Sequence, residues 1–134
     1  MLEAFQTGYK KLVAYDYSEH AIDRQRDLLS IEPGADSLDL SVQDARELPS
    51  SWEGSFGGII EKGCLDAVYL SGDGQLELAV AEMKRVLAPG GKLISISGVV
   101  PAELRSALFC DDEWDWLRDG ATDLQAGVFI LRRR

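Results

Sequence analysis

The sequence predicts an α/β fold built on a mainly parallel sheet. Short apolar runs alternate with segments of helical periodicity, which is the pattern of strand–helix–strand units. Several of these runs are continuous, as expected of strands that are buried on both faces. With 134 residues, 46% of them hydrophobic, the chain is expected to form a single domain over residues 1–134.

Four apolar runs predict the strands of this sheet. They cover residues 12–15, 38–42, 56–61 and 92–97. Apolar and polar residues alternate in the second run, which indicates a half-exposed strand. Two further extended stretches, around residues 114–116 and over residues 127–131, predict an antiparallel pair of strands near the C-terminus.

Three helices are expected between these strands. Ser18 is a typical N-cap for the first helix, which we expect to continue as far as Pro33 and Gly34. The second helix has apolar residues at helical spacing and is expected to stop at residues 89–91, a proline followed by two glycines. The third carries Leu104 and Leu108 on one side.

The charge of the chain excludes some classes of partner. The formal net charge is −9, from 14 basic and 23 acidic residues. Such a surface repels phosphate backbones and anionic lipids, so we expect no nucleic-acid partner and no membrane partner. The only basic run, residues 132–134, is interpreted as a solvated tail.

Cysteine and histidine usage argues against a metal site. Cys64 and Cys110 lack the spacing of a zinc motif, and His20 is the only histidine. No apolar run approaches the length of a membrane span, and the start of the chain lacks the pattern of a secretory leader. We therefore expect a soluble, cytoplasmic protein without a metal.

Acidic residues follow three of the predicted strands. They are Asp16, Asp44 and Glu61. The carboxyl ends of parallel strands share one edge of a sheet, where open α/β folds bind ligands. Three carboxylates there would suit a ligand with ribose hydroxyls, an amino group and a positive charge. The alternative is that polar loops simply begin where strands end.

Three segments resemble motifs of the class I S-adenosylmethionine-dependent methyltransferases. Residues 13–22 (VAYDYSEHAI) resemble the second-strand motif, residues 43–49 (QDARELP) the third-strand motif, and residues 85–93 (RVLAPGGKL) the turn into the fifth strand. Their order and spacing imply a Rossmann-like methyltransferase fold with S-adenosyl-L-methionine as cofactor.

A fourth segment narrows the resemblance. Residues 59–68 (IIEKGCLDAV) look like the signature of the methyltransferase-like 13 group, which includes lysine methyltransferases of elongation factor 1-alpha and of citrate synthase. The sequence departs from that signature at Glu61, where the group usually has Asp, and at Cys64, where it usually has Thr. Glutamate retains the charge of aspartate, whereas cysteine lacks the hydroxyl of threonine.

The resemblance implies a role for each cofactor-binding residue. Asp16 would bind the ribose hydroxyls, and Tyr17 would pack on the adenine. Asp44 would accept a hydrogen bond from the adenine amino group, while the backbone amide of Ala45 would meet a ring nitrogen. Glu61 would lie near the methionine part and the methyl group.

The resemblance also implies a protein substrate, with a lysine of an elongation factor as one candidate acceptor. Glu61 and Asp66 are the candidate catalytic residues, because they could orient the incoming ammonium, and Lys62 would help to shape the acceptor pocket. The alternative for Asp66 is that it caps the helix that begins nearby.

The first strand and the glycine-rich loop of the family are not found in the sequence. Residues 2–11 resemble the end of the helix that follows this loop. The absent strand would lie between the strand of Asp16 and the strand of Glu61. We therefore expect either a gap in the core or direct contact between those two strands.

Two rival functions would share part of this pattern. A nicotinamide dehydrogenase would use Asp16 in the same way, but its glycine fingerprint is absent and no tyrosine is followed four residues later by lysine. The other rival is a truncated, inactive methyltransferase-like protein that acts as an interaction module for a basic partner. Cofactor binding would discriminate between that module and the enzyme.

Overall fold

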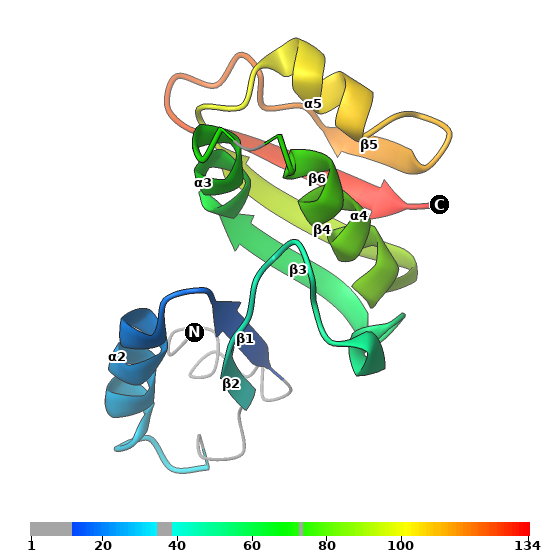
Figure 1. Ribbon diagram of the computed structural model, residues 1–134. Helices are drawn as coiled ribbons and strands as arrows, with labels where there is room; N and C mark the ends of the chain where they lie inside the picture. The colour runs from blue at the N-terminus through cyan, green and yellow to red at the C-terminus, as the bar shows by residue number, and fades with distance from the viewer. Residues whose placement is uncertain (1–11, 35–38, 73) are drawn as a thin grey trace. The chain divides into compact units, whose positions relative to one another are not determined.

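The computed structural model describes residues 12–34, 39–72 and 74–134 (Figure 1). Contacts divide the chain into two compact units, Met1–Asp44 and Ala45–Arg134. Each unit contains one sheet. The single domain expected over residues 1–134 stays a prediction. Within the described ranges, no helix is both long and apolar enough to cross a membrane.

The first unit is a strand–helix–strand segment, as the sequence predicted. Its elements are β1 (Val13–Asp16), α2 (Glu19–Leu29) and β2 (Asp39–Val42). The two strands are parallel, and their ladder pairs Val13 with Asp39 and Asp16 with Val42. Leu38, the expected start of the second strand, and residues 2–11 lie outside the described residues.

Helix α2 begins as predicted. The Ser18 hydroxyl oxygen accepts a hydrogen bond from the Ala21 amide at 3.3 Å, which satisfies one of the free amides of the first turn. Ile22 and Leu29 are buried and form the apolar face of the helix.

The end of α2 comes earlier than predicted. The helix stops at Leu29, before Pro33 and Gly34. The Ser30 amide closes the last turn, and the Ser30 hydroxyl donates to the carbonyl oxygen of Asp27 at 2.7 Å. A serine side chain that satisfies a late carbonyl in this way competes with a further helical turn.

The second unit is built on a four-stranded sheet. Its strands are β3 (Phe56–Lys62), β4 (Leu87–Ser97), β5 (Trp114–Arg118) and β6 (Gly127–Arg133). Their order in the sheet is β3-β4-β6-β5. Strands β3 and β4 are parallel, whereas β6 is antiparallel to both β4 and β5. The C-terminal antiparallel pair is confirmed, and the sheet joins parallel and antiparallel strands.

Helices α3 (Cys64–Leu70) and α4 (Leu76–Val86) lie on one face of this sheet in Figure 1. The other helical elements of the unit are η2 (Ser50–Trp52) and α5 (Ala102–Leu108). The buried side of α4 consists of Leu76, Ala79, Val80, Met83 and Val86. Its helical spacing therefore places an apolar stripe in the core, as the sequence predicted.

Helix α4 also ends earlier than predicted. It stops at Val86, not at residues 89–91, and Leu87 is already extended and fully buried. Leu87 pairs with Phe56 in the ladder between β3 and β4, and its carbonyl oxygen accepts a hydrogen bond from the Arg133 guanidinium. These tertiary partners favour an extended Leu87 over another helical residue.

The described strands of the two units form separate sheets. Strand β1 pairs only with β2, and β3 pairs only with β4, among the residues that the structure describes. The direct pairing of the Asp16 strand with the Glu61 strand, one of the two expected outcomes, is therefore not observed in these ladders. The described residues form an α/β fold with parallel and antiparallel strands.

The basic run at residues 132–134 is not a solvated tail, so that interpretation was wrong. Arg132 and Arg133 belong to β6. Asp115 on β5 forms an ion pair with Arg132 at 3.1 Å and another with Arg134 at 2.9 Å. Antiparallel pairing with β5 explains the difference, because it brings the acidic side chain beside both arginines.

Candidate functional site

Two of the predicted site residues lie at the same edge of the first unit. Asp16 is the last residue of β1 and pairs with Val42, two residues before Asp44. The backbone amide of Gln43 donates to the carbonyl oxygen of Asp16 at 3.0 Å. The parallel ladder therefore brings both acidic residues to the carboxyl ends of neighbouring strands.

The side chain of Asp16 also shapes the turn into α2. Its Oδ1 atom accepts a hydrogen bond from the Ser18 amide at 2.9 Å. Tyr17, between these two residues, is 77% exposed. The turn therefore leaves an exposed aromatic ring next in sequence to a carboxylate, and a nucleoside offers hydroxyls to the carboxylate and a flat base to the ring.

In the second unit, Glu61 lies on β3 beside Ser95 on β4. Its side chain is buried, and the residue is 4% exposed. The Ser95 hydroxyl donates to Oε2 at 2.5 Å, and the Leu65 amide donates to Oε1 at 3.0 Å. Burial is the largest influence and raises the pKa of Glu61, although these hydrogen bonds act in the opposite direction.

We expect Glu61→Gln to increase stability at neutral and alkaline pH. Folding raises the pKa of Glu61 above its unfolded-state pKa of about 4.5. The contribution of Glu61 to stability is therefore complete below pH 4.5 and is lost as pH rises through the folded-state pKa. The gain in unfolding free energy, of the order of 1 kcal/mol, should therefore appear at pH 8 and vanish near pH 4. Urea unfolding at both pH values measures it.

The matched control is Glu103→Gln on the exposed first turn of α5. This variant should leave the unfolding free energy within about 0.5 kcal/mol at both pH values. A Glu61→Gln variant that is less stable than the native chain at pH 8 would contradict the expected cost of burying this carboxylate.

Asp66 holds the loop that follows β4. Its carboxylate accepts hydrogen bonds from the Ser97 hydroxyl at 2.5 Å and from the backbone amides of residues 98–100 at 3.0 to 3.3 Å. Burial raises its pKa, but these four hydrogen bonds outweigh burial, and the net pKa is lowered. The cap hypothesis was wrong, because the N-cap of α3 is Gly63, which makes no side-chain cap hydrogen bond, and Asp66 lies within the first turn of the helix.

Arg105 on α5 was not found by sequence analysis. It is 2% exposed, whereas Leu104 and Leu108, the expected apolar side of this helix, are only half buried. Its Nη2 donates to the Ser97 hydroxyl at 2.8 Å, and its guanidinium lies 3.8 Å from the centre of the Phe129 ring. The helical pattern assigned only apolar residues to the core, so it missed this cation.

Burial and the charges of Asp66 and Glu61 influence the pKa of Arg105. Burial is the largest influence and lowers the pKa of the guanidinium, while the charges of Asp66 and Glu61 act to raise it. Among the described residues, Nε and Nη1 have no hydrogen-bond partner. The second unit thus places two predicted site acids and one unpredicted cation at the carboxyl ends of β3 and β4.

Ser95 and Ser97 were also missed. Both are buried on the same face of β4, where one binds Glu61 and the other links Asp66 to Arg105. The sequence did carry a signal for them. Residues two apart on a strand share a face, so Ser95 and Ser97 fall on the same face of a predicted strand that is otherwise apolar there. Buried hydroxyls need partners, and acids elsewhere provide them.

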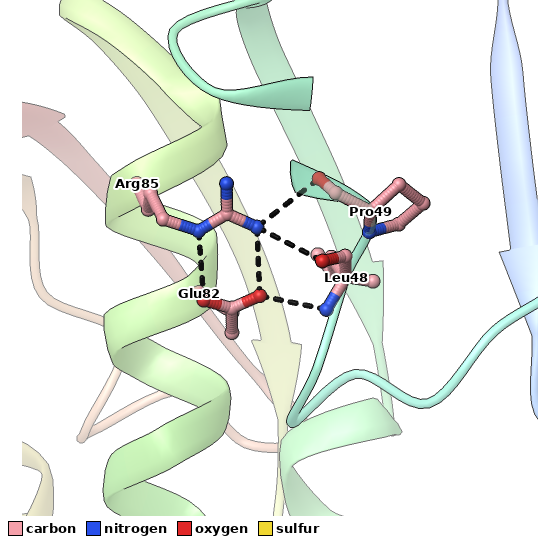
Figure 2. Close-up of polar contacts among 4 residues, drawn as sticks. All are labelled: Leu48, Pro49, Glu82 and Arg85. Atoms are coloured by element: carbon pink, nitrogen blue, oxygen red, sulfur yellow. Dashed lines mark hydrogen bonds and ion pairs between the residues drawn. The ribbon is translucent and has the colours of Figure 1, made fainter. Parts of the chain in front are cut away.

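Ala45 begins a segment that is attached to α4. Ala45 and Leu48 are buried, and the Arg46 side chain donates to Gln75 at 2.6 Å. Figure 2 shows how Glu82 and Arg85 bind the Leu48 and Pro49 backbone. Within the described ranges, no group of three or more His, Cys, Asp or Glu residues could hold a metal ion.

Comparisons with known proteins identify the family. A family model described as a methyltransferase domain matches residues 1–95. The chain therefore belongs to this methyltransferase family. The fold agrees with that assignment, since solved methyltransferase structures superpose on nearly the whole chain.

One solved structure is S-adenosylmethionine-bound CalS10, an amino pentose methyltransferase from Micromonospora echinaspora. It has a TM-score of 0.76 and 15% identity, with 99% of this chain and 78% of that chain covered. The N-methyltransferase NodS from Bradyrhizobium japonicum WM9, in complex with S-adenosyl-L-homocysteine, has a TM-score of 0.69 and 18% identity, with 92% and 67% covered. Both establish the Rossmann-like methyltransferase fold.

A curated relative has higher identity. The EEF1A lysine methyltransferase 4 of Mus musculus is 29% identical over 126 residues, which are 85% of this chain and 47% of that protein. The chain thus spans about half the length of this relative.

Proposed function

We propose that this protein is an S-adenosylmethionine-dependent protein-lysine N-methyltransferase. Membership of the methyltransferase family supports the reaction class and the cofactor. The observation that favours lysine is the 29% identity to EEF1A lysine methyltransferase 4 over 85% of this chain. The comparisons give no support to the alternative of an inactive interaction module.

In this proposal, the residues at the edge of the first unit bind the nucleoside. Asp16 binds the ribose hydroxyls, Tyr17 packs on the adenine, and Asp44 accepts from its amino group. The residues fit these roles. Asp16 uses Oδ1 for the turn, and its Oδ2 accepts no hydrogen bond from the described residues, while the ring of Tyr17 is exposed. A carboxylate oxygen can accept hydroxyl protons directly.

The Ala45 amide and Glu61 complete the proposed cofactor contacts. The amide meets a ring nitrogen of the adenine, and Glu61 lies near the methionine part. Bound S-adenosylmethionine supplies a methyl group that is activated by the sulfonium charge. The acids of the second unit contribute a negative potential that stabilises positive charge nearby.

The acceptor is a lysine amine of a protein. An unperturbed lysine has a pKa of about 10.4, so the amine must lose a proton before its lone pair can attack the methyl carbon. The nitrogen–carbon bond forms while the carbon–sulfur bond breaks, and its electron pair stays on sulfur. Glu61 and Asp66 attract the incoming ammonium, and Asp66 also holds residues 98–100 in place. Alignment of the amine accounts for much of the rate enhancement.

The test is calorimetric titration of the purified chain with S-adenosylhomocysteine, followed by methyl transfer to elongation factor 1-alpha from S-adenosylmethionine. We expect micromolar binding and a mass increase of whole methyl groups on the acceptor. An acceptor with chemically acetylated lysines is the control and should gain none. A folded chain that releases no heat at millimolar ligand would refute the proposal and favour the interaction module.

A further inference from the structure

We propose that Glu82 and Arg85 form a clamp that positions the Ala45 backbone amide for the cofactor, so that Arg85 is a positioning residue for cofactor binding. This inference rests on the proposed function, in which the Ala45 amide meets the adenine. The clamp is defined as the side chains of Glu82 and Arg85 on α4 together with the backbone of Leu48 and Pro49 that they bind (Figure 2).

The two side chains bind each other first. Glu82 and Arg85 are three residues apart on α4, a spacing that places them on one helix face. Arg85 donates through Nε to Oε1 at 2.8 Å and through Nη2 to Oε2 at 2.9 Å. This two-pronged pairing is the largest influence that lowers the pKa of Glu82 and raises the pKa of Arg85.

The pair then binds the backbone of the neighbouring segment from both sides. Glu82 Oε2 accepts from the Leu48 amide at 2.6 Å, while Arg85 Nη2 donates to the carbonyl oxygens of Leu48 and Pro49 at 3.1 and 3.2 Å. The carboxylate thus satisfies the donor and the guanidinium satisfies two acceptors. Charged partners make these hydrogen bonds stronger than neutral ones.

The segment that is held cannot easily adjust. Leu48 precedes a proline, which restricts it to an extended conformation. Its side chain is buried, as is that of Ala45. Arg46 adds a third attachment through its hydrogen bond to Gln75 at 2.6 Å. Ala45 lies three residues from Leu48, a span of at most about 11 Å, so fixing Leu48 limits the movement of the Ala45 amide.

The helix that carries the clamp is itself fixed by its buried apolar face, which includes Met83 and Val86 beside the clamp residues. The clamp is partly covered, because the side chains of Glu82 and Arg85 are 18% and 27% exposed. Salt screens a partly covered ion pair less than a fully exposed pair. Preorganised amides bind a ligand without an ordering cost, which is the physical gain from the clamp.

The test compares two variants, each of which removes one cationic side chain from α4. Arg85→Ala removes the clamp, and Lys84→Ala removes the adjacent cation, which forms an ion pair with Glu113 at 3.0 Å. Affinity for S-adenosylhomocysteine and for adenosine is measured well below the melting temperature of each variant. We expect Arg85→Ala to weaken binding of both ligands about tenfold, because the released segment must be ordered again when the ligand binds. Lys84→Ala should stay within about twofold, as surface pairs usually do.

A second readout does not depend on cofactor. Amide hydrogen exchange should become faster at residues 45–48 in Arg85→Ala and stay unchanged in β4, because only the clamped segment is released. If Arg85→Ala does not fold, Glu82→Gln takes its place. This variant removes the negative charge of Glu82 and keeps the length of its side chain.

The outcomes separate this inference from the proposed function. If the unaltered chain binds no S-adenosylhomocysteine, the proposed function fails and the inference fails with it. If the unaltered chain binds but Arg85→Ala and Lys84→Ala have equal affinity, only the inference is overturned. Equal exchange at residues 45–48 in the two variants would overturn it as well.

Discussion

Asp66→Ala is expected to lower the free energy of unfolding by about 3 kcal/mol, the scale of a lost network of hydrogen bonds to a charged group. The carboxylate accepts four hydrogen bonds, three of them from the backbone amides of residues 98–100. Alanine leaves these amides and the Ser97 hydroxyl without their acceptor. Urea unfolding at pH 7 measures the loss.

The pH dependence gives this prediction a second check. Because the folded-state pKa of Asp66 is lowered, its contribution is complete above the ordinary value of about 3.8 and is lost as pH falls through the folded value. The difference between the native chain and Asp66→Ala should therefore shrink in acid. The difference expected for Glu61→Gln also vanishes in acid but has the opposite sign, because ionised Asp66 stabilises the fold whereas ionisation of buried Glu61 costs stability.

The matched control for Asp66 is Glu77→Ala, which removes an acid from the first turn of α4 just as Asp66→Ala removes one from the first turn of α3. Glu77 is exposed, so the loss should stay below about 1 kcal/mol. Equal losses in the two variants would show that Asp66 acts only through its helix and not through the loop after β4.

Asp16→Ala is expected to weaken binding of S-adenosylhomocysteine about 100-fold. In the proposed function, Asp16 accepts two ribose hydroxyls, and the loss of hydrogen bonds to a charged acceptor costs about 3 kcal/mol in total. Calorimetric titration measures the change in the dissociation constant. The expected loss exceeds that of the clamp variant because Asp16 would touch the ligand itself.

Two further variants separate ligand binding from turn formation. Asp16→Asn retains an oxygen that can accept from the Ser18 amide and so preserves the turn, but it lacks the charge. Its affinity should lie between those of the native chain and Asp16→Ala. Asp23→Ala, on the exposed side of α2, should bind like the native chain. Unchanged affinity in Asp16→Ala would remove Asp16 from the proposed site.

Much of the second unit could be predicted from local sequence. Apolar periodicity identified α4, and β-type runs identified β3 and the two C-terminal strands, because these patterns follow from which faces are buried. Helix ends were less predictable. Leu87 left α4 for a ladder with Phe56 and a bond to Arg133, and neither partner is visible from neighbouring residues.

The candidate site, too, could be predicted only in part. Acids at strand ends were visible as a pattern, since parallel strands share an edge, and the ladder between β1 and β2 indeed brings Asp16 and Asp44 to one edge. The partners of the acids were not visible. Asp66 meets residues more than thirty positions away, and Arg105 is buried by a ring from β6.

By itself, the sequence determined the α/β class, most of the elements and the family motifs of this protein, because periodicity, capping and strand-end chemistry are local properties. Only the tertiary structure decided which charges are buried and what they bind. Burial changes the cost of a charge, and a buried group takes whichever partner the fold brings within reach. Glu61, Asp66, Arg105 and the clamp of Glu82 and Arg85 all depend on such distant partners.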